Sequence, residues 1–190
     1  MSEQNSGLTS GTPRKNSLKE ELIEWVKAVL SAAVIVAVVF GIFIKPVEVI
    51  GRSMEPTLHG GDRLIVWKFC YEPKNGDPVI LSENTGLNEA LVKRVIATEG
   101  QTVEITDTGD VFVDGVLLEE DYISELINPD EIGDHAYPVT VPEGHLFVMG
   151  DNRNHSTDSR SEQVGFVDVD EVIGKVVFRL LPISDVGLIK

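Results

Sequence analysis

The stretch TVEITDTGDVFVDGVLL, residues 102–118, shows most directly which fold this chain adopts. It contains three short runs of β-branched and other apolar residues, at 102–106, 111–113 and 116–118, and Asp114-Gly115 between the last two is typical of a two-residue hairpin turn. Similar runs separated by turn residues continue after Pro46, where no long stretch keeps the apolar period of a helix. The pattern predicts an all-β domain. We expect strands over residues 47–50, 63–67, 78–81, 90–97, 102–106, 111–118, 145–149 and 171–181.

The composition excludes several classes of protein. The chain has 190 residues, enough for one domain of about 100–150 residues with an appendage. Its net charge of −15 argues against a nonspecific nucleic-acid binder, which needs a positive surface. The single cysteine, Cys70, excludes an internal disulfide framework and a CxxC metal site. The segment from Val95 to Asn152 contains 14 Asp and Glu and no Lys or Arg, so we expect a solvated acidic surface there.

An uncharged apolar run lies near the amino terminus. The 17 residues 28–44 would span about 26 Å as a helix, close to the roughly 30 Å hydrocarbon core of a membrane. Four Lys or Arg residues precede this run and two follow it at short range, which favours a cytoplasmic amino terminus. A cleaved secretory signal and a buried soluble helix are the alternatives. We expect a cytoplasmic tail over residues 1–21, a transmembrane signal-anchor helix over 22–45 and an extracytoplasmic domain over 46–190.

Three polar segments contain candidate catalytic residues. Residues 51–58 place Ser53 in a loop directly after a predicted strand, although a plain turn has the same pattern. In residues 91–96, Lys93 lies among aliphatic residues of a strand, where burial would lower the pKa of its amine toward that of a general base. The alternative is an amine that reaches solvent. Residues 150–160 are a dense polar run, either an exposed loop or a fixed hydrogen-bond network.

Together these segments resemble the type I bacterial signal peptidases, or leader peptidases, which are membrane-anchored proteases with a Ser-Lys dyad. The S-M-x-P-T-L box corresponds to residues 53–58, the K-R-V-I box to 93–96 and the G-D-N-R-x-x-S-x-D-S-R box to 150–160. The resemblance covers roughly residues 20–185. It implies an antiparallel, barrel-like β catalytic domain with a small β cap at about residues 101–144, preceded by one transmembrane helix.

The resemblance also implies roles for individual residues. Ser53 is the expected nucleophile, Lys93 the general base and Ser156 the partner of the lysine amine. The Ser53 backbone N–H is the expected oxyanion donor, because Gly51 stands where some relatives have a serine hydroxyl, as in the branch common in Gram-positive bacteria. We expect that a serine fits at position 51 and leaves activity equal or higher. The expected supporting residues are Arg94, Asp151, Asp158 and Arg160, and the expected substrate-cleft residues are Met54 and Val92.

The function implied by the resemblance is cleavage of amino-terminal signal peptides from secreted preproteins, after small residues at positions −1 and −3. The site would lie at the outer face of the cytoplasmic membrane, with preproteins and the lipid bilayer as partners and with no nucleic acid, metal or cofactor. A related Ser-Lys protease that processes itself or a regulator is one alternative. A non-catalytic membrane-tethered β-domain that binds secreted chains is another. His145 and His155 leave a Ser-His mechanism open.

Overall fold

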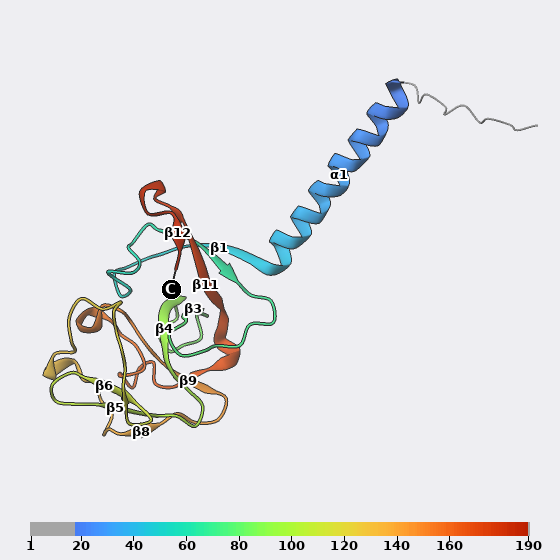
Figure 1. Ribbon diagram of the computed structural model, residues 1–190. Coiled ribbons are helices and arrows are strands. Elements are labelled where there is room, and N and C mark those ends of the chain that lie inside the picture. Colours follow the sequence, from blue (N-terminus) through green and yellow to red (C-terminus); the bar gives the residue numbers. More distant parts are fainter. Residues whose placement is uncertain (1–17, 190) are drawn as a thin grey trace, which may run out of the picture. The chain divides into compact units, whose positions relative to one another are not determined.

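The computed structural model describes residues 18–189 of the chain (Figure 1). These residues divide between Val39 and Phe40 into two compact units. The first contains most of helix α1, and the second contains every strand of the described residues. The predicted cytoplasmic tail over residues 1–21 lies outside the described residues up to position 17.

Helix α1 runs from Leu18 to Phe43. Five of its first ten residues are charged, and none is charged from Ala28 onward. Within residues 18–189, no helix combines the length and the apolarity that crossing a membrane requires. The transmembrane helix predicted over residues 22–45 is therefore not confirmed. The helix ends before Pro46, which cannot continue a helix, and Ile44 already belongs to the first strand.

Eight strands form the main sheet, and all its paired neighbours are antiparallel. The path runs β1-β2-β11-β3-β4-β9-β10, and β12 pairs with β11 beside that path. The domain is thus the antiparallel β domain that the sequence predicts, although the path stays open at β1 and β10. The strands are β1 (Ile44–Glu48), β2 (Arg63–Trp67), β3 (Pro78–Leu81), β4 (Leu91–Thr98), β9 (His145–Met149), β10 (Val167–Asp168), β11 (Val172–Leu181) and β12 (Gly187–Leu188).

A second sheet of four strands forms what we call the cap, residues 101–144. Its order is β7-β6-β5-β8, and Figure 1 shows β5, β6 and β8 together at the end of the domain remote from β12. The hairpin turn lies at Asp114-Gly115, whose φ angles of 52° and 77° are the positive values that such a turn needs. The strands are β5 (Thr102–Ile105), β6 (Val111–Val113), β7 (Val116–Leu117) and β8 (Val139–Thr140).

Strands β4 and β9 form a wall between two apolar cores. Phe147 and Met149 pack with the cap residues, whereas Leu146 and Val148 pack on the opposite side of β9. This alternation is the two-residue period of a strand that is buried on both faces. The wall is therefore well fixed, and it holds the chain directly before the third polar segment. Short 3-10 turns lie at Pro129–Glu131, Arg153–His155, Val169–Glu171 and Ile183–Asp185.

The register of β4 places the second and third polar segments side by side. Arg94 on β4 is paired with Met149, the last residue of β9, and Val79 on β3 is paired with Lys93. The loop that begins at Gly150 therefore starts next to Lys93 and Arg94. Strand pairing, rather than proximity in sequence, assembles the site.

Candidate active site

Residues 51–62 carry the partly buried Ser53 between β1 and β2. They are here called the nucleophile loop, after the role that the sequence resemblance implies for Ser53. The loop is tied to the segment 150–160 by three hydrogen bonds. The Asn152 backbone N–H donates to the Ser53 carbonyl at 3.0 Å, and the Asn152 side-chain amide donates to the Arg52 carbonyl at 3.1 Å. The Thr57 hydroxyl donates to an Asp151 carboxylate oxygen at 2.5 Å. These bonds fix the backbone on both sides of Ser53.

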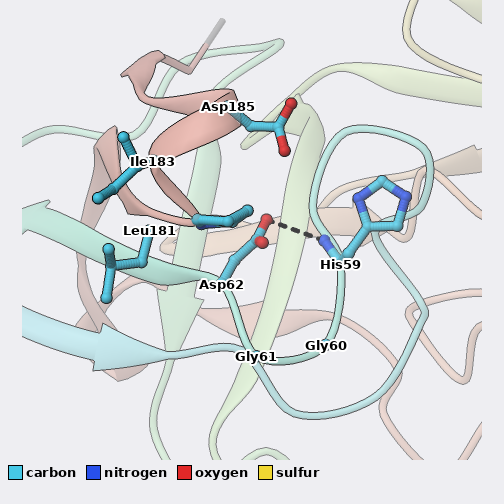
Figure 2. A pocket seen from close by; sticks show the side chains of 8 residues that line it. His59, Gly60, Gly61, Asp62, Leu181, Ile183 and Asp185 are labelled. Carbon is cyan, nitrogen blue, oxygen red and sulfur yellow. Dashed lines mark hydrogen bonds between the residues drawn. The ribbon is translucent and has the colours of Figure 1, made fainter.

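The far end of the nucleophile loop is held by an ion pair beside a surface hollow. Figure 2 shows this hollow between residues 59–62 and 181–185, with the Asp62 carboxylate turned toward the His59 backbone N–H, which donates to it at 3.0 Å. Arg179 of β11 donates to Asp62 at 2.8 Å and to the Thr57 carbonyl at 3.1 Å. Neither Ser53 nor Lys93 lines the hollow. The Arg179 bonds therefore brace the loop in addition to the bond from Thr57 to Asp151.

Lys93 lies in the middle of β4 with only 2% of its surface exposed. Its Nζ donates to the Ser156 hydroxyl oxygen at 2.9 Å. Burial lowers the pKa of the Lys93 amine, and this effect outweighs the nearby negative charge of Asp158, while Arg160 adds to the lowering. The amine is thereby brought toward the neutral form that accepts a proton.

Gly150 shows how closely Ser53 and Ser156 approach each other. A Cβ at this position would lie 2.4 Å from the Ser53 carbonyl oxygen and 2.3 Å from the Ser156 hydroxyl oxygen. Because Gly150 has no side chain, the nucleophile loop and Ser156, the hydrogen-bond partner of Lys93, can both lie close to its backbone. No direct hydrogen bond joins the Ser53 hydroxyl to the Lys93 amine, both of which are described residues, and such bonds often tighten only when substrate is bound.

Asp158 and Arg160 form a buried ion pair within the third segment. Arg160 donates from Nε to one Asp158 oxygen at 2.8 Å and from Nη2 to the other at 3.0 Å. Burial alone would raise the pKa of Asp158, but the hydrogen bonds and charge of Arg160 hold it below its ordinary value. The Gly150 backbone N–H also donates to Asp158, at 2.9 Å. The pair therefore fixes both ends of the loop that carries Ser156.

Arg94 and Asp151 form a second buried pair, which joins β4 to the same loop. Arg94 donates from Nε at 2.8 Å and from Nη2 at 2.7 Å to the two Asp151 oxygens, and from Nη1 to the Gly76 carbonyl at 2.7 Å. Bidentate pairs of this kind fix geometry as well as charge. Because Asp151 also accepts from Thr57, one carboxylate links β4 with the nucleophile loop.

Gly51 has a φ of +85°, in the left-handed region that disfavours residues with a side chain. The expectation that serine fits at this position without strain is therefore wrong. The space around a Cβ at Gly51 is open, so the obstacle is the backbone conformation and not a neighbouring atom. The glycine serves the turn that leads into Ser53.

The two expected cleft residues differ in exposure. Met54 has 1% of its surface exposed and packs in the core with Leu58, Leu64 and Val66, so the structure does not place it at an open surface. Val92 is partly buried and packs against the same core. Met54 supports the nucleophile loop from beneath, because its side chain anchors the residue next to Ser53.

Sequence reasoning missed several residues that hold the site. Thr57 and Arg179 bind the nucleophile loop, and Arg153 and Glu120 form a buried pair beside Gly150. Arg153 lies inside the third box, but its partner is 33 positions away in the cap. The sequence carries no periodic signal for such a pairing. Among residues 18–189, no cluster of three or more His, Cys, Asp or Glu side chains is arranged to hold a metal ion.

Comparison with known proteins identifies the family. The family described as signal peptidase, peptidase S26, matches residues 22–181. This chain belongs to that family. The match includes the nucleophile loop, β4 and the segment 150–160, and it ends with the last residue of β11. All the candidate residues therefore lie inside it.

Two curated relatives match this chain over most of their own length. Signal peptidase I of Bacillus licheniformis is 38% identical over 182 residues, which cover 91% of this chain and 96% of that protein. Signal peptidase IB of Staphylococcus aureus is 34% identical over 186 residues, which cover 88% and 94%. A crystal structure of a signal peptidase I from Enterococcus faecalis is 31% identical, with a TM-score of 0.46, and the match covers 55% of this chain and 97% of that one.

Gly51→Ser is expected to lower activity. A side chain in the left-handed region costs about 1–2 kcal/mol, and distortion beside Ser53 should reduce kcat about tenfold. The measurement is turnover of a preprotein by the folded variant. Gly187→Ser is the matched control, because Gly187 has open space and no positive φ. Activity of Gly51→Ser at or above that of the unsubstituted protein contradicts the requirement for glycine.

Proposed function

We propose that this chain is a serine endopeptidase that removes amino-terminal signal peptides from secreted preproteins, with Ser53 as nucleophile and Lys93 as general base. One observation carries the proposal. Lys93 has only 2% of its surface exposed, and its amine lies 2.9 Å from the Ser156 hydroxyl oxygen, beside the loop that presents Ser53. A buried amine of lowered pKa is the proton acceptor that a serine nucleophile needs. Membership of the signal peptidase family supports the substrate class.

The proposed reaction has two steps. The Ser53 oxygen attacks the scissile carbonyl carbon while its proton passes to the neutral Lys93 amine. The resulting ammonium gives that proton to the leaving amine, which releases the mature protein and leaves an acyl-enzyme. A water molecule then attacks the ester, again losing a proton to Lys93, and that proton returns to Ser53 as the signal peptide leaves. The enzyme is regenerated without any net change in its protonation.

The other residues position these groups. Ser156 accepts a hydrogen bond from the lysine amine, so it directs the remaining lone pair of the neutral amine toward the nucleophile loop. The Ser53 backbone N–H is the proposed oxyanion donor, because a donor preorganised at the nucleophile stabilises the developing charge. Two ion pairs, Arg94–Asp151 and Asp158–Arg160, hold the loops that carry these groups.

The proposed specificity is for small residues at positions −1 and −3 of the signal peptide. Val92, partly buried beside Lys93, is available as one wall of a shallow pocket. Met54 is buried in the core below the nucleophile loop, so we propose that it supports this pocket without lining it. The resemblance to signal peptidases supports this preference.

We also propose that the apolar segment 28–44 attaches the enzyme to the cytoplasmic membrane, with the catalytic domain on the outer face. The uncharged sequence of the segment and the excess of basic residues before it support this placement. Because no helix of residues 18–189 meets the requirements for crossing, the experiment below separates crossing from attachment at the surface.

Ser53→Ala, Lys93→Ala and Lys93→Arg are each expected to reduce cleavage at least about a thousandfold, because they remove interdependent parts of one catalytic unit. A guanidinium stays protonated and cannot replace the neutral amine. The assay incubates the purified protein with a preprotein and sequences the new amino terminus. His145→Ala and His155→Ala are the controls and should cleave normally. Loss of activity in either histidine variant, with an active Lys93→Arg, rejects the dyad in favour of a Ser-His mechanism.

The pH profile should report the buried amine. Because the neutral form of Lys93 is active and burial lowers its pKa, kcat/KM should rise with pH and reach half its maximum below the ordinary lysine value of 10.5. Activity should then persist into the alkaline range. Circular dichroism over the same range checks that the fold is unchanged. A rising limb centred on the ordinary lysine value contradicts a buried catalytic amine.

Membrane attachment should depend on residues 28–44. Full-length protein is expected in the membrane fraction after a wash at alkaline pH, which removes proteins attached only at the surface, whereas a variant lacking these residues should be released. Protease added outside intact cells should digest the catalytic domain. Release of the full-length protein by the wash contradicts a crossing, and digestion only after lysis reverses the proposed orientation.

A further inference from the structure

Glu120 of the cap makes a buried ion pair with the segment that carries Ser156. The Glu120 side chain is 6% exposed, and that of its partner, Arg153, is fully buried. Arg153 Nη1 donates to one Glu120 oxygen at 3.0 Å, and Nη2 donates to the other. The cap is therefore bonded directly to the third polar segment.

Arg153 passes this contact on to Gly150. Its Nε donates to the Gly150 carbonyl at 3.1 Å, and its own carbonyl accepts a hydrogen bond from Arg160 at 2.6 Å. Gly150 is the position where a Cβ would lie within 2.4 Å of both Ser53 and Ser156 atoms. Because Gly150 lies against the Ser53 carbonyl and the Ser156 hydroxyl, a shift of its backbone would displace both residues.

Tyr122, two residues after Glu120, completes the contact from the cap. Its hydroxyl donates to Glu120 at 3.1 Å, and the Arg94 guanidinium carbon lies 4.0 Å from the centre of its ring. Burial, followed by the charge of Glu120, raises the pKa of Tyr122, so the hydroxyl keeps its proton and remains a donor. Tyr122 thus orients Glu120, and its ring packs on Arg94, the residue next to Lys93.

We propose that Glu120 is a positioning residue for catalysis, which acts through Arg153 to hold Gly150 and thereby the Ser53 and Ser156 loops in register. The proposal rests on the proposed roles of Ser53 and Lys93. It assigns to the cap a part in the chemistry, although no cap residue touches the reacting atoms. With its carboxylate partner removed, Arg153 is a buried unpaired cation that rearranges, and the Gly150 carbonyl loses its donor.

The first test compares Glu120→Gln with Glu119→Gln, the same change in charge at the exposed neighbouring residue. In folded Glu120→Gln, kcat should fall about 10–100-fold, the size expected when catalytic groups shift by a fraction of an ångström to an ångström, while KM changes less than about threefold. Glu119→Gln should behave as the unsubstituted protein. Unchanged kcat in Glu120→Gln, or an equal loss in Glu119→Gln, overturns the proposal.

A double variant separates positioning from the mere presence of a buried charge. Glu120→Gln combined with Arg153→Met removes both charges, so no unpaired cation remains to destabilise the fold. Its kcat should be as low as that of Arg153→Met alone, because Gly150 lacks its donor in both. A double variant with the kcat of the unsubstituted protein overturns the positioning role.

Hydrogen exchange distinguishes failure of this proposal from failure of the proposed function. The Asn152 amide donates to the Ser53 carbonyl, so its exchange reports whether the two loops stay together. Exchange of this amide should accelerate at least about tenfold in Glu120→Gln and remain unchanged in Glu119→Gln, whether or not the protein cleaves preproteins. Unchanged exchange in Glu120→Gln overturns the proposal. If exchange accelerates in Glu120→Gln but the unsubstituted protein never cleaves preproteins, only the proposed function is overturned.

Discussion

The buried Arg94–Asp151 ion pair is the constraint on which the geometry of the site depends. It joins the strand of Lys93 to the loop of Ser156, and through Thr57 it also holds the loop of Ser53. Taking two charges out of water is costly, so such a pair adds little net stability unless its remaining donors are satisfied. Here Arg94 also donates to a backbone carbonyl, and its guanidinium carbon lies 4.0 Å from the centre of the Tyr122 ring. The apolar cores supply the stability, and the ion pairs fix the positions of the proposed catalytic groups.

The fold was predictable wherever a strand carries its own apolar pattern. The strands expected over 63–67, 78–81 and 145–149 have those bounds in the structure, and the hairpin turn lies at Asp114-Gly115. The first strand was expected over 47–50 but runs from Ile44 to Glu48, because its pairing with β2 determines its length. The two-residue strands β8, β10 and β12 were missed. Strands so short exist only through hydrogen bonds to their partners, which no local pattern reveals.

The site was predictable to the extent that its residues are contiguous in sequence. The three boxes contain Ser53, Lys93 and Ser156 together with the four expected supporting residues, and strand register brings the boxes to one place. The structure shows that these four residues form two ion pairs. Glu120 and Arg179 were missed as contributors because their partners are remote and their own neighbourhoods are ordinary. Thr57 lies in the first box, but its role was missed because its partner is 94 positions away. The conformation of Gly51 was also misjudged, since a glycine in a sequence does not state the sign of its φ.

The hydrogen bonds that brace the nucleophile loop have a further consequence, for the order in which the chain becomes active. Thr57 and Asp151 are 94 positions apart, and Asp62 and Arg179 are 117 positions apart. Contacts of such long sequence separation form late in folding. A chain that emerges amino terminus first therefore presents Ser53 and Lys93 well before the residues that align them. The contacts that brace the nucleophile loop therefore form only when nearly all of the polypeptide has been made.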